Sequence, residues 1–328
     1  MGDLLSALAD LGGAGLATVE LEAGRRFDLP GGQGVVRLGV HRAGPLPDAD
    51  LDAFDILLSA DPVAPRPWVG LAPEALEAAL ARIAANITAQ PVAAAVAAQV
   101  LRASLSLTFD QALAAESLAY SMLLASDEFH AWRSAYLAPV RDDQDAPRVA
   151  VSRDGEALSI RLTRSSAHNA VDARMRDALC EALEFALIDP DQAAVVLSGE
   201  GRAFSEGGDL AEFGRFGDPG RAHLLRTLRS PAALVRRLGP RATAQVHGAC
   251  IGAGIEIPAA AARVVARRHT WFRLPEVAMG LIPGAGGTVT IPRRIGRRRA
   301  AFMAISGVDI RASTALAWGL VDAVEGAG

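Results

Sequence analysis

The amino-acid sequence predicts an α/β fold in which a mainly helical N-terminal domain precedes a domain of alternating strands and helices. Its 328 residues are enough for about two domains of ordinary size. Apolar residues recur at helical spacing from Leu71 to about Leu137, whereas strand and helix patterns alternate after Val149. We therefore assign residues 1–145 to the helical domain and residues 146–328 to the α/β domain.

The N-terminal domain contains three predicted helices. Pro73, followed by acidic residues, suits the first turn of one helix, and Pro91 separates it from a second helix over residues 92–103. A third helix fits Asp110–Leu124. The stripe that the first helix buries consists of Leu76, Leu80, Ile83 and Ile87. In the first seventy residues only Val36–His41 shows a clear pattern, the alternation of a strand.

A charged linker and a hairpin open the second domain. Residues 141–145 carry charge without apolar periodicity and favour a linker. Val149–Ser152 and Leu158–Leu162 flank an Asp-Gly turn pair and predict a β-hairpin.

The remaining elements of this domain alternate between helix and strand. Asp172 is placed to cap a helix whose apolar residues share one face. Strands are predicted over Ala193–Leu197 and Ala242–Val246, with a helix near Arg221–Leu238 between them. Such alternation with short loops is typical of layered α/β domains.

The composition excludes several kinds of chemistry. The sequence contains no lysine, so all 33 basic residues are arginine. Walker-type phosphate loops, lysine Schiff bases and pyridoxal phosphate attachment all need a lysine and are excluded. A formal net charge of −4 without a concentrated basic region argues against a nucleic-acid partner. Cys180 and Cys250 are too few for a disulfide framework and lie outside any CxxC metal pattern.

The sequence predicts a cytoplasmic protein without a membrane segment. The first residues include Asp3 and lack the basic stretch that begins a secretory signal. Apolar residues make up 51% of the chain, yet no uninterrupted, strongly apolar span reaches about 18 residues.

Two glycine-rich segments of the second domain carry glutamates in apolar surroundings. Glu256 lies in residues 247–261, which follow a predicted strand and open an apolar helix. Such a carboxylate has either a function or an ion pair with a nearby arginine, and the residues alone leave both readings open. Glu276 precedes the glycine-rich loop 280–288. Two glutamates can orient one water as acid and base, although a lone Pro-Glu pair more often marks only a helix start.

A third glycine-rich segment completes a recognisable set. Phe204–Leu210 taken alone is an ordinary tight turn in which Asp209 caps the next helix. Together, FSEGGDL, GACIGAGIEI and PEVAMGLIPGAGGT resemble, in order, the motifs of the enoyl-CoA hydratase/isomerase (crotonase) superfamily. The resemblance covers about residues 149–324, and the 20 positions between Glu256 and Glu276 match the spacing of the two catalytic glutamates in hydratases.

The resemblance implies a crotonase-like ββα spiral core and a lyase that adds water across the 2,3 double bond of an acyl-CoA thioester. No cofactor or metal is implied. The backbone N–H groups of Gly208 and Ala253 would form the oxyanion hole. Glu256 and Glu276 would form the acid/base pair, with their individual roles unassigned. The further residues expected to bind substrate are Gly207, Gly252 and Gly284. A homo-oligomer, trimer or hexamer, is also implied.

Three features depart from the family pattern. Glu206 replaces a small residue and either points to solvent or contacts a polar group of the substrate. Arg293–Arg299 holds five arginines, which form either a solvated helix face or a contact with coenzyme A phosphates. Phe109–Trp132 resembles helices that the family places after its core, so we expect the N-terminal domain to supply a cap or oligomerisation module.

Alternatives remain within and outside this superfamily. An enoyl-CoA isomerase commonly keeps only one of the two glutamates, and a cofactor-independent arylacetyl-CoA dioxygenase needs no water-holding pair. The presence of both Glu256 and Glu276 therefore favours a hydratase. A non-catalytic scaffold that binds acyl-CoA is the alternative from a different functional class.

Overall fold

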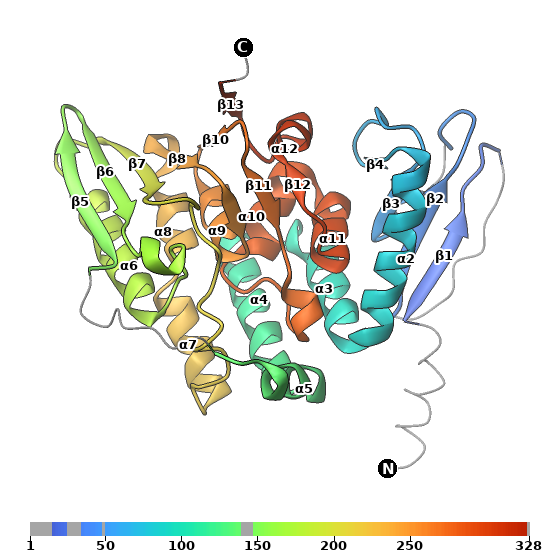
Figure 1. Cartoon of the computed structure of the whole chain (residues 1–328), viewed down its shortest axis with the longest axis horizontal. Coiled ribbons are helices and arrows are strands. Elements are labelled where there is room, and N and C mark those ends of the chain that lie inside the picture. The colour runs from blue at the N-terminus through green and yellow to red at the C-terminus, as the bar shows by residue number, and fades with distance from the viewer. Residues whose placement is uncertain (1–14, 25–33, 48–49, 139–146, 327–328) are drawn as a thin grey trace.

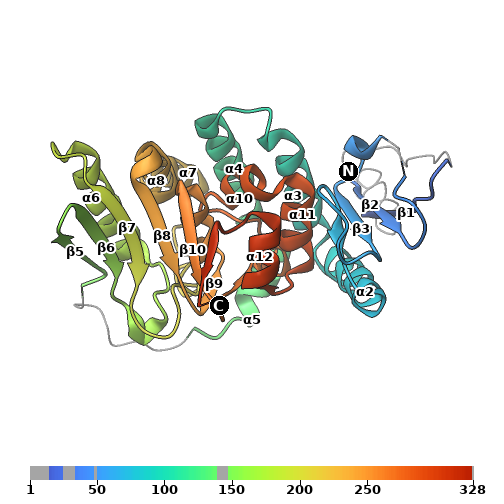
Figure 2. The same cartoon turned by 90° about the horizontal axis from the view of Figure 1, so that it is seen from above.

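Two groups of strands lie at opposite ends of the molecule, with helices packed between them (Figures 1 and 2). The computed structural model describes residues 15–24, 34–47, 50–138 and 147–326. The predicted linker at 141–145 lies outside these residues, so the boundary at 145/146 stays a prediction. One cluster of buried apolar side chains extends from Val36 to Val321 and joins both halves of the chain.

The N-terminal half opens with a four-stranded parallel sheet in the order β1-β2-β3-β4. The expectation of a mainly helical domain is therefore wrong for the first 70 residues. Of these strands, Ile56–Ser59 is wholly buried and Val69–Gly70 has only two residues, so neither shows alternation, whereas Val36–His41 was predicted with these bounds. The strands are β1 (Leu16–Glu20), β2 (Val36–His41), β3 (Ile56–Ser59) and β4 (Val69–Gly70).

Four helices follow this sheet, and here the helical prediction is confirmed. Pro73 occupies the first turn of a helix, as expected, and Pro91, expected to separate two helices, is itself the first residue of the second. Thr108 and Gln111 form a reciprocal capping box at the start of the third helix. The helices are α2 (Pro73–Ala89), α3 (Pro91–Ser104), α4 (Phe109–Leu123) and α5 (Asp127–Ala135).

The second half contains a six-stranded sheet in the order β13-β10-β8-β7-β6-β5 and a small sheet in the order β12-β11-β9. The predicted hairpin is confirmed, because β5 and β6 pair antiparallel while the inner strands of the large sheet pair in parallel. The large sheet consists of β5 (Val149–Asp154), β6 (Ala157–Leu162), β7 (Ala194–Gly199), β8 (Ala242–Val246), β10 (Arg263–Arg267) and β13 (Ala323–Glu325). The small sheet consists of β9 (Ala249–Ile251), β11 (Trp271–Arg273) and β12 (Ile310–Arg311).

Helices of the second half include one correction. Asp172 caps the predicted helix by accepting a 2.7 Å hydrogen bond from the Met175 amide. The helix predicted near Arg221–Leu238 is two helices, because Pro231 lacks the amide hydrogen that would continue the first. The helices are α6 (Ala173–Ile188), α7 (Pro219–Leu228), α8 (Pro231–Arg237), α9 (Ala253–Glu256), α10 (Gly287–Ile295), α11 (Arg297–Ser306) and α12 (Ala312–Trp318). Short 3-10 turns include η2 (Ser165–Ala167), η4 (Pro258–Ala260) and η5 (Glu276–Met279).

The arginine cluster at 293–299 is buried or partly buried and mostly contacts the N-terminal half, so the expectation of a solvated helix face is wrong, and a contact with coenzyme A phosphates stays a prediction. Arg293 donates to the carbonyl groups of Ser104 and Leu107, and Arg297 donates to that of Phe54. Arg299 is buried, and its Nε donates to the Trp68 carbonyl at 2.9 Å. None of the five arginines lines the cavity described below. Backbone carbonyls of the N-terminal half are thus partners of four of these arginines, whereas Arg294 donates to the Ala259 and Ala261 carbonyls of the second half.

In the described residues, no single helix has the length and apolar character needed to cross a membrane. The consecutive helices α2 and α3 meet that requirement only together, and the chain bends by 110° between them.

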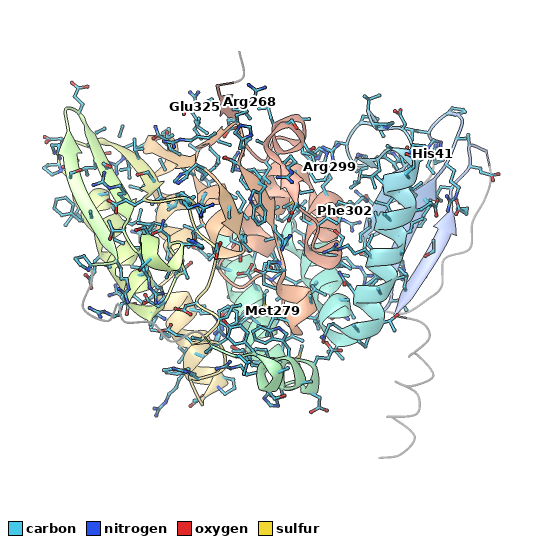
Figure 3. The ribbon with its side chains drawn as sticks, viewed as in Figure 1. His41, Arg268, Met279, Arg299, Phe302 and Glu325 are labelled. Atoms are coloured by element: carbon cyan, nitrogen blue, oxygen red, sulfur yellow. The ribbon has the colours of Figure 1, made fainter. Side chains whose placement is uncertain are left out.

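Replacing Arg299 by Met should lower the free energy of unfolding by about 1–3 kcal/mol, because the buried Trp68 carbonyl loses its donor. The exposed Arg268, which Figure 3 shows near the C-terminal end, supplies the control variant Arg268→Met. Urea denaturation of both variants measures the difference. Equal midpoints for wild type and Arg299→Met would contradict a joining role for this arginine.

Candidate active site

A cavity of ≈ 410 Å³ lies where the glycine-rich segments of the second half meet helices α4 and α7. Its wall includes Glu256 and Glu276, the two glutamates singled out from the sequence. Both are buried, with exposed fractions of 2% and 7%. The predicted residues Gly208, Ala253 and Gly284 also line it. The sequence segments therefore converge on one cavity.

The loop that carries FSEGGDL is fixed by buried polar side chains. The Asn169 side-chain amide donates to the carbonyl groups of Ala203 and Phe204, at 3.1 and 3.0 Å. Asp209 accepts a 2.8 Å bond from the buried Arg164, so it is an ion-pair partner and not the cap of a helix. These contacts hold Gly208 against the cavity without using its amide.

Close backbone packing brings the second motif against this loop. A Cβ atom on Gly254 would lie 2.3 Å from the Ser205 carbonyl oxygen, so only glycine allows this approach. Gly254 lies in the short helix α9, whose first residue is Ala253. Among the hydrogen bonds between described residues, none uses the amide N–H of Gly208 or Ala253. Two backbone donors on the cavity wall therefore have no protein acceptor.

The two glutamates converge over Gly252. A Cβ placed on this glycine would lie 2.5 Å from Oε1 of Glu276 and 3.6 Å from Oε1 of Glu256. The φ angle of Gly252 is 50°, in the left-handed region that glycine adopts without strain. Absence of a side chain here leaves the space that both carboxyl groups face.

Four successive backbone amides bind two glutamates in alternation. Ala285 and Gly287 donate to Oε2 of Glu256, at 2.7 and 2.8 Å. Gly286 and Thr288 donate to the two oxygens of Glu116, at 2.7 and 2.8 Å. The Thr288 hydroxyl adds a 2.7 Å bond to Glu116. These amides form the N-terminus of α10, which favours negative charge.

Glu116 comes from α4 in the N-terminal half, and we did not identify it from the sequence. It is 2% exposed and lines the cavity beside Glu256. Its spacing in the sequence could have indicated burial, because Glu116 shares one buried face of the helix with Ala112, Tyr120 and Leu123. A glutamate on such a face requires buried donors, which the sequence does not show directly.

Burial raises the pKa values of all three glutamates, since a desolvated carboxylate is unfavourable. The pKa of Glu116 rises to about 8 and that of Glu256 to about 7, mainly from desolvation. The pKa of Glu276 rises well above its ordinary value, from desolvation and the nearby Glu256. Oε2 of Glu276 is buried without a hydrogen-bond partner. Glu276 is therefore the glutamate most readily protonated.

The remaining predicted residues lie around the cavity. Gly207 and Gly252 are buried and do not line the cavity. The Glu206 side chain is 44% exposed and pairs with His168 at 2.9 Å, outside the cavity lining. Cys180 and Cys250 are buried free thiols. Among the described residues, no His, Cys, Asp and Glu side chains form a group that could hold a metal ion. The expectations of no metal and no cofactor stay predictions.

Replacing Glu116 by Ala should lower the free energy of unfolding by about 2–4 kcal/mol, because buried donors at the start of α10 lose their acceptor. Glu128 offers a matched control, since it accepts from the Val92 and Ala93 amides at the start of α3 but is less buried. Glu128→Ala should cost only about 0.5–2 kcal/mol. Thermal unfolding of the two variants tests this, and an equal or smaller loss in Glu116→Ala would contradict the assignment.

Comparison with known proteins identifies the family of the second half. Residues 153–327 match the family described as enoyl-CoA hydratase/isomerase. A 2,3-dehydroadipyl-CoA hydratase of Escherichia coli (strain K12) is 34% identical over 53% of this chain and 68% of its own length. A mevalonyl-coenzyme A hydratase of Beauveria bassiana is 32% identical over 50% of this chain and 62% of its own length.

Solved structures give the same result. An enoyl-CoA hydratase from Thermoplasma volcanium GSS1 matches with a TM-score of 0.51 and 32% identity, covering 55% of this chain and 72% of that one. An enoyl-CoA hydratase from Bacillus anthracis matches with a TM-score of 0.50 and 28% identity, over 54% and 69% of the two chains. The crotonase-like α/β fold that the motifs implied is thus confirmed for the second half. The chain belongs to the enoyl-CoA hydratase/isomerase family.

Proposed function

We propose that this chain hydrates the 2,3 double bond of an acyl-CoA thioester. The observation that carries the proposal is the convergence of two buried glutamates and two backbone donors without protein acceptors on one cavity. Relatives named as hydratases of acyl-CoA esters support it. The matched part spans about two thirds of those relatives' lengths, so activity, substrate and oligomeric state are all proposals.

In this mechanism the thioester carbonyl binds the amides of Gly208 and Ala253. Both amides lie on the cavity wall and have no acceptor among the described residues. Negative charge develops on the carbonyl oxygen as water adds to C3, and two fixed N–H donors stabilise that enolate-like state. The donors need no reorganisation, because the loop and α9 are already held in place.

Different hydrogen-bond environments assign separate roles to the two glutamates. Glu256 accepts two backbone amides at a helix N-terminus, which favours its ionised form as the base. Glu276 has a buried oxygen without a donor, which favours its protonated form as the acid. A water between them loses a proton to Glu256 as its oxygen bonds to C3, and Glu276 supplies the proton to C2.

The other functions considered from the sequence become outcomes of the tests. An isomerase moves the double bond without adding water, and a dioxygenase consumes oxygen with arylacetyl-CoA. A homo-oligomer and a cytoplasmic location also stay predictions. Hydration is favoured because the two carboxyl groups face the same space over Gly252.

Purified protein should remove the conjugated-thioester absorbance of 2-enoyl-CoA esters. Glu276→Gln and Glu256→Gln should each lower kcat by about 10²–10⁴-fold, the usual effect of losing a general acid or base. Glu206→Gln is the matched control, since Glu206 is partly exposed and outside the cavity lining.

The products separate the alternatives. A 3-hydroxyacyl-CoA product supports hydration, whereas a shifted double bond identifies an isomerase and oxygen uptake a dioxygenase. Absence of turnover with short, long and aromatic enoyl esters, or full activity in Glu276→Gln, would refute the proposal.

The pH dependence of kcat/KM should be bell-shaped. Protonation of the base stops the reaction as pH falls, and the pKa of Glu256 near 7 places the acid limb in that region. Deprotonation of Glu276 stops it as pH rises, and its strongly raised pKa moves the alkaline limb far above an ordinary carboxyl. Because the groups interact, the measured values belong to the pair. Steady-state rates across pH 5–10 test this, and a flat profile would contradict the role assignment.

A further inference from the structure

One side of the cavity carries a polar cluster that the proposed reaction does not use. Helices α4 and α7 lie against each other there and supply Ser117, Ser121, His223 and Arg226. His223 Nδ1 lies 3.0 Å from the Ser117 hydroxyl, and Arg226 Nε lies 3.1 Å from the same oxygen. Ser117 and Arg226 both line the cavity.

Arg226 differs from the other two arginines on the cavity wall. Arg176 pairs with Asp177 at 2.9 Å, and Arg229 lies within 4 Å of acidic groups on α6. Arg226 forms no ion pair with any described residue, and it donates to two serine hydroxyls and a serine carbonyl. Its Nη1 donates to none of them. The cavity therefore contains a half-buried cation with no ion pair to a described residue, although the Glu116 carboxyl acts on it electrostatically.

Arg226 is half-buried, and burial lowers its pKa, while Tyr120 and Glu116 act in the opposite direction. A guanidinium remains charged nonetheless. A half-buried charge is most stable when an anion of matching geometry binds to it, and a carboxylate accepts two parallel N–H bonds from arginine.

Aromatic contacts connect the oxyanion donors to Arg226. A Cβ on Gly208 would lie 2.6 Å from the Phe213 ring, and the Phe213 and Tyr120 rings meet edge to face at 6.5 Å. The Arg226 guanidinium carbon lies 4.8 Å from the centroid of the Tyr120 ring. All four residues line the cavity. An acyl group whose carbonyl oxygen binds the Gly208 amide can therefore extend along the two aromatic rings to Arg226.

We propose that the acyl group ends in a carboxylate and that Arg226 binds it. This inference rests on the proposed function for the place of the thioester, and it names the substrate class as acyl-CoA esters of dicarboxylic acids. Phe213 and Tyr120 contact the methylene segment, while Ser117 and Ser121 hold the guanidinium in position. Arg226 acts here as a specificity-determining residue and takes no part in the proton transfers.

Binding of saturated esters tests the inference without any chemistry. Isothermal titration compares succinyl-, adipyl- and suberyl-CoA with butyryl-, hexanoyl- and octanoyl-CoA, and free coenzyme A is titrated separately. At the chain length that reaches Arg226, wild type should bind the diacid ester at least about tenfold more tightly than its monoacid partner, since a charge-assisted hydrogen bond is worth that much.

The variants are chosen to separate charge from packing. Arg226→Gln keeps hydrogen-bond donors for Ser117 and should abolish the preference, whereas Arg226→Lys should retain part of it. Arg221→Gln is the matched control, because Arg221 is an exposed arginine of α7 outside the cavity lining. It should leave every dissociation constant unchanged.

Each remaining outcome overturns one of the two proposals. No preference for a diacid ester at any length, or a preference that survives in Arg226→Gln, refutes the role of Arg226. Weaker binding of free coenzyme A by Arg226→Gln assigns this arginine to the nucleotide phosphates and also refutes it. A diacid preference without turnover of any enoyl ester would refute the hydratase proposal and leave the carboxylate site intact.

Discussion

The alternating attachment of Glu256 and Glu116 to four successive amides is the interaction on which the site depends. Each glutamate uses every second N–H from Ala285 to Thr288, so the loop before α10 is held by both carboxyl groups at once. Glu256 belongs to the same half of the chain as this loop, but Glu116 comes from α4. The contact therefore fixes the loop, the base and the cavity wall together.

A second set of contacts, made by arginine side chains, also joins the two halves. Arg297 and Arg298 donate to backbone carbonyls around Leu51–Phe54, and Arg299 donates to Trp68. A guanidinium can donate several bonds in fixed directions to neighbouring carbonyls, which a single ammonium group cannot do. In a chain without lysine, this cluster serves structure, and the cations at the cavity come from α6, α7 and the turn after it.

The sequence predicted what local patterns encode. The Pro73 helix start, the Asp-Gly hairpin turn and the Asp172 cap depend on residues close in the chain, and each prediction is confirmed. Glu256 and Glu276 were recognised because motif spacing reflects the family's fold. The N-terminal sheet was missed, since short buried strands such as β3 lack the alternation that marks a half-exposed strand.

Partners distant in the chain could not be predicted in this way. The arginine cluster looked like a solvated face because Arg293 and Arg297 donate to carbonyl groups that lie more than 180 residues earlier. Glu116 was overlooked for the same reason, as its donors are 170 and 172 residues away. A sequence pattern indicates which face of a helix or strand a residue lies on. The partner of that residue depends on tertiary packing when it is distant in the chain.

Three buried glutamates around one helix start also explain how acid and base stay distinct. All three are desolvated, and burial alone would raise the pKa of each without determining which one is protonated first. Backbone amides make the three glutamates differ in protonation, because Glu256 and Glu116 accept hydrogen bonds from them whereas one oxygen of Glu276 accepts none. If α4 moved away, the Gly286 and Thr288 amides would lose their acceptor and the loop that holds Glu256 would relax. The charge state of the proposed base thus depends on a helix that precedes the entire family-matched region.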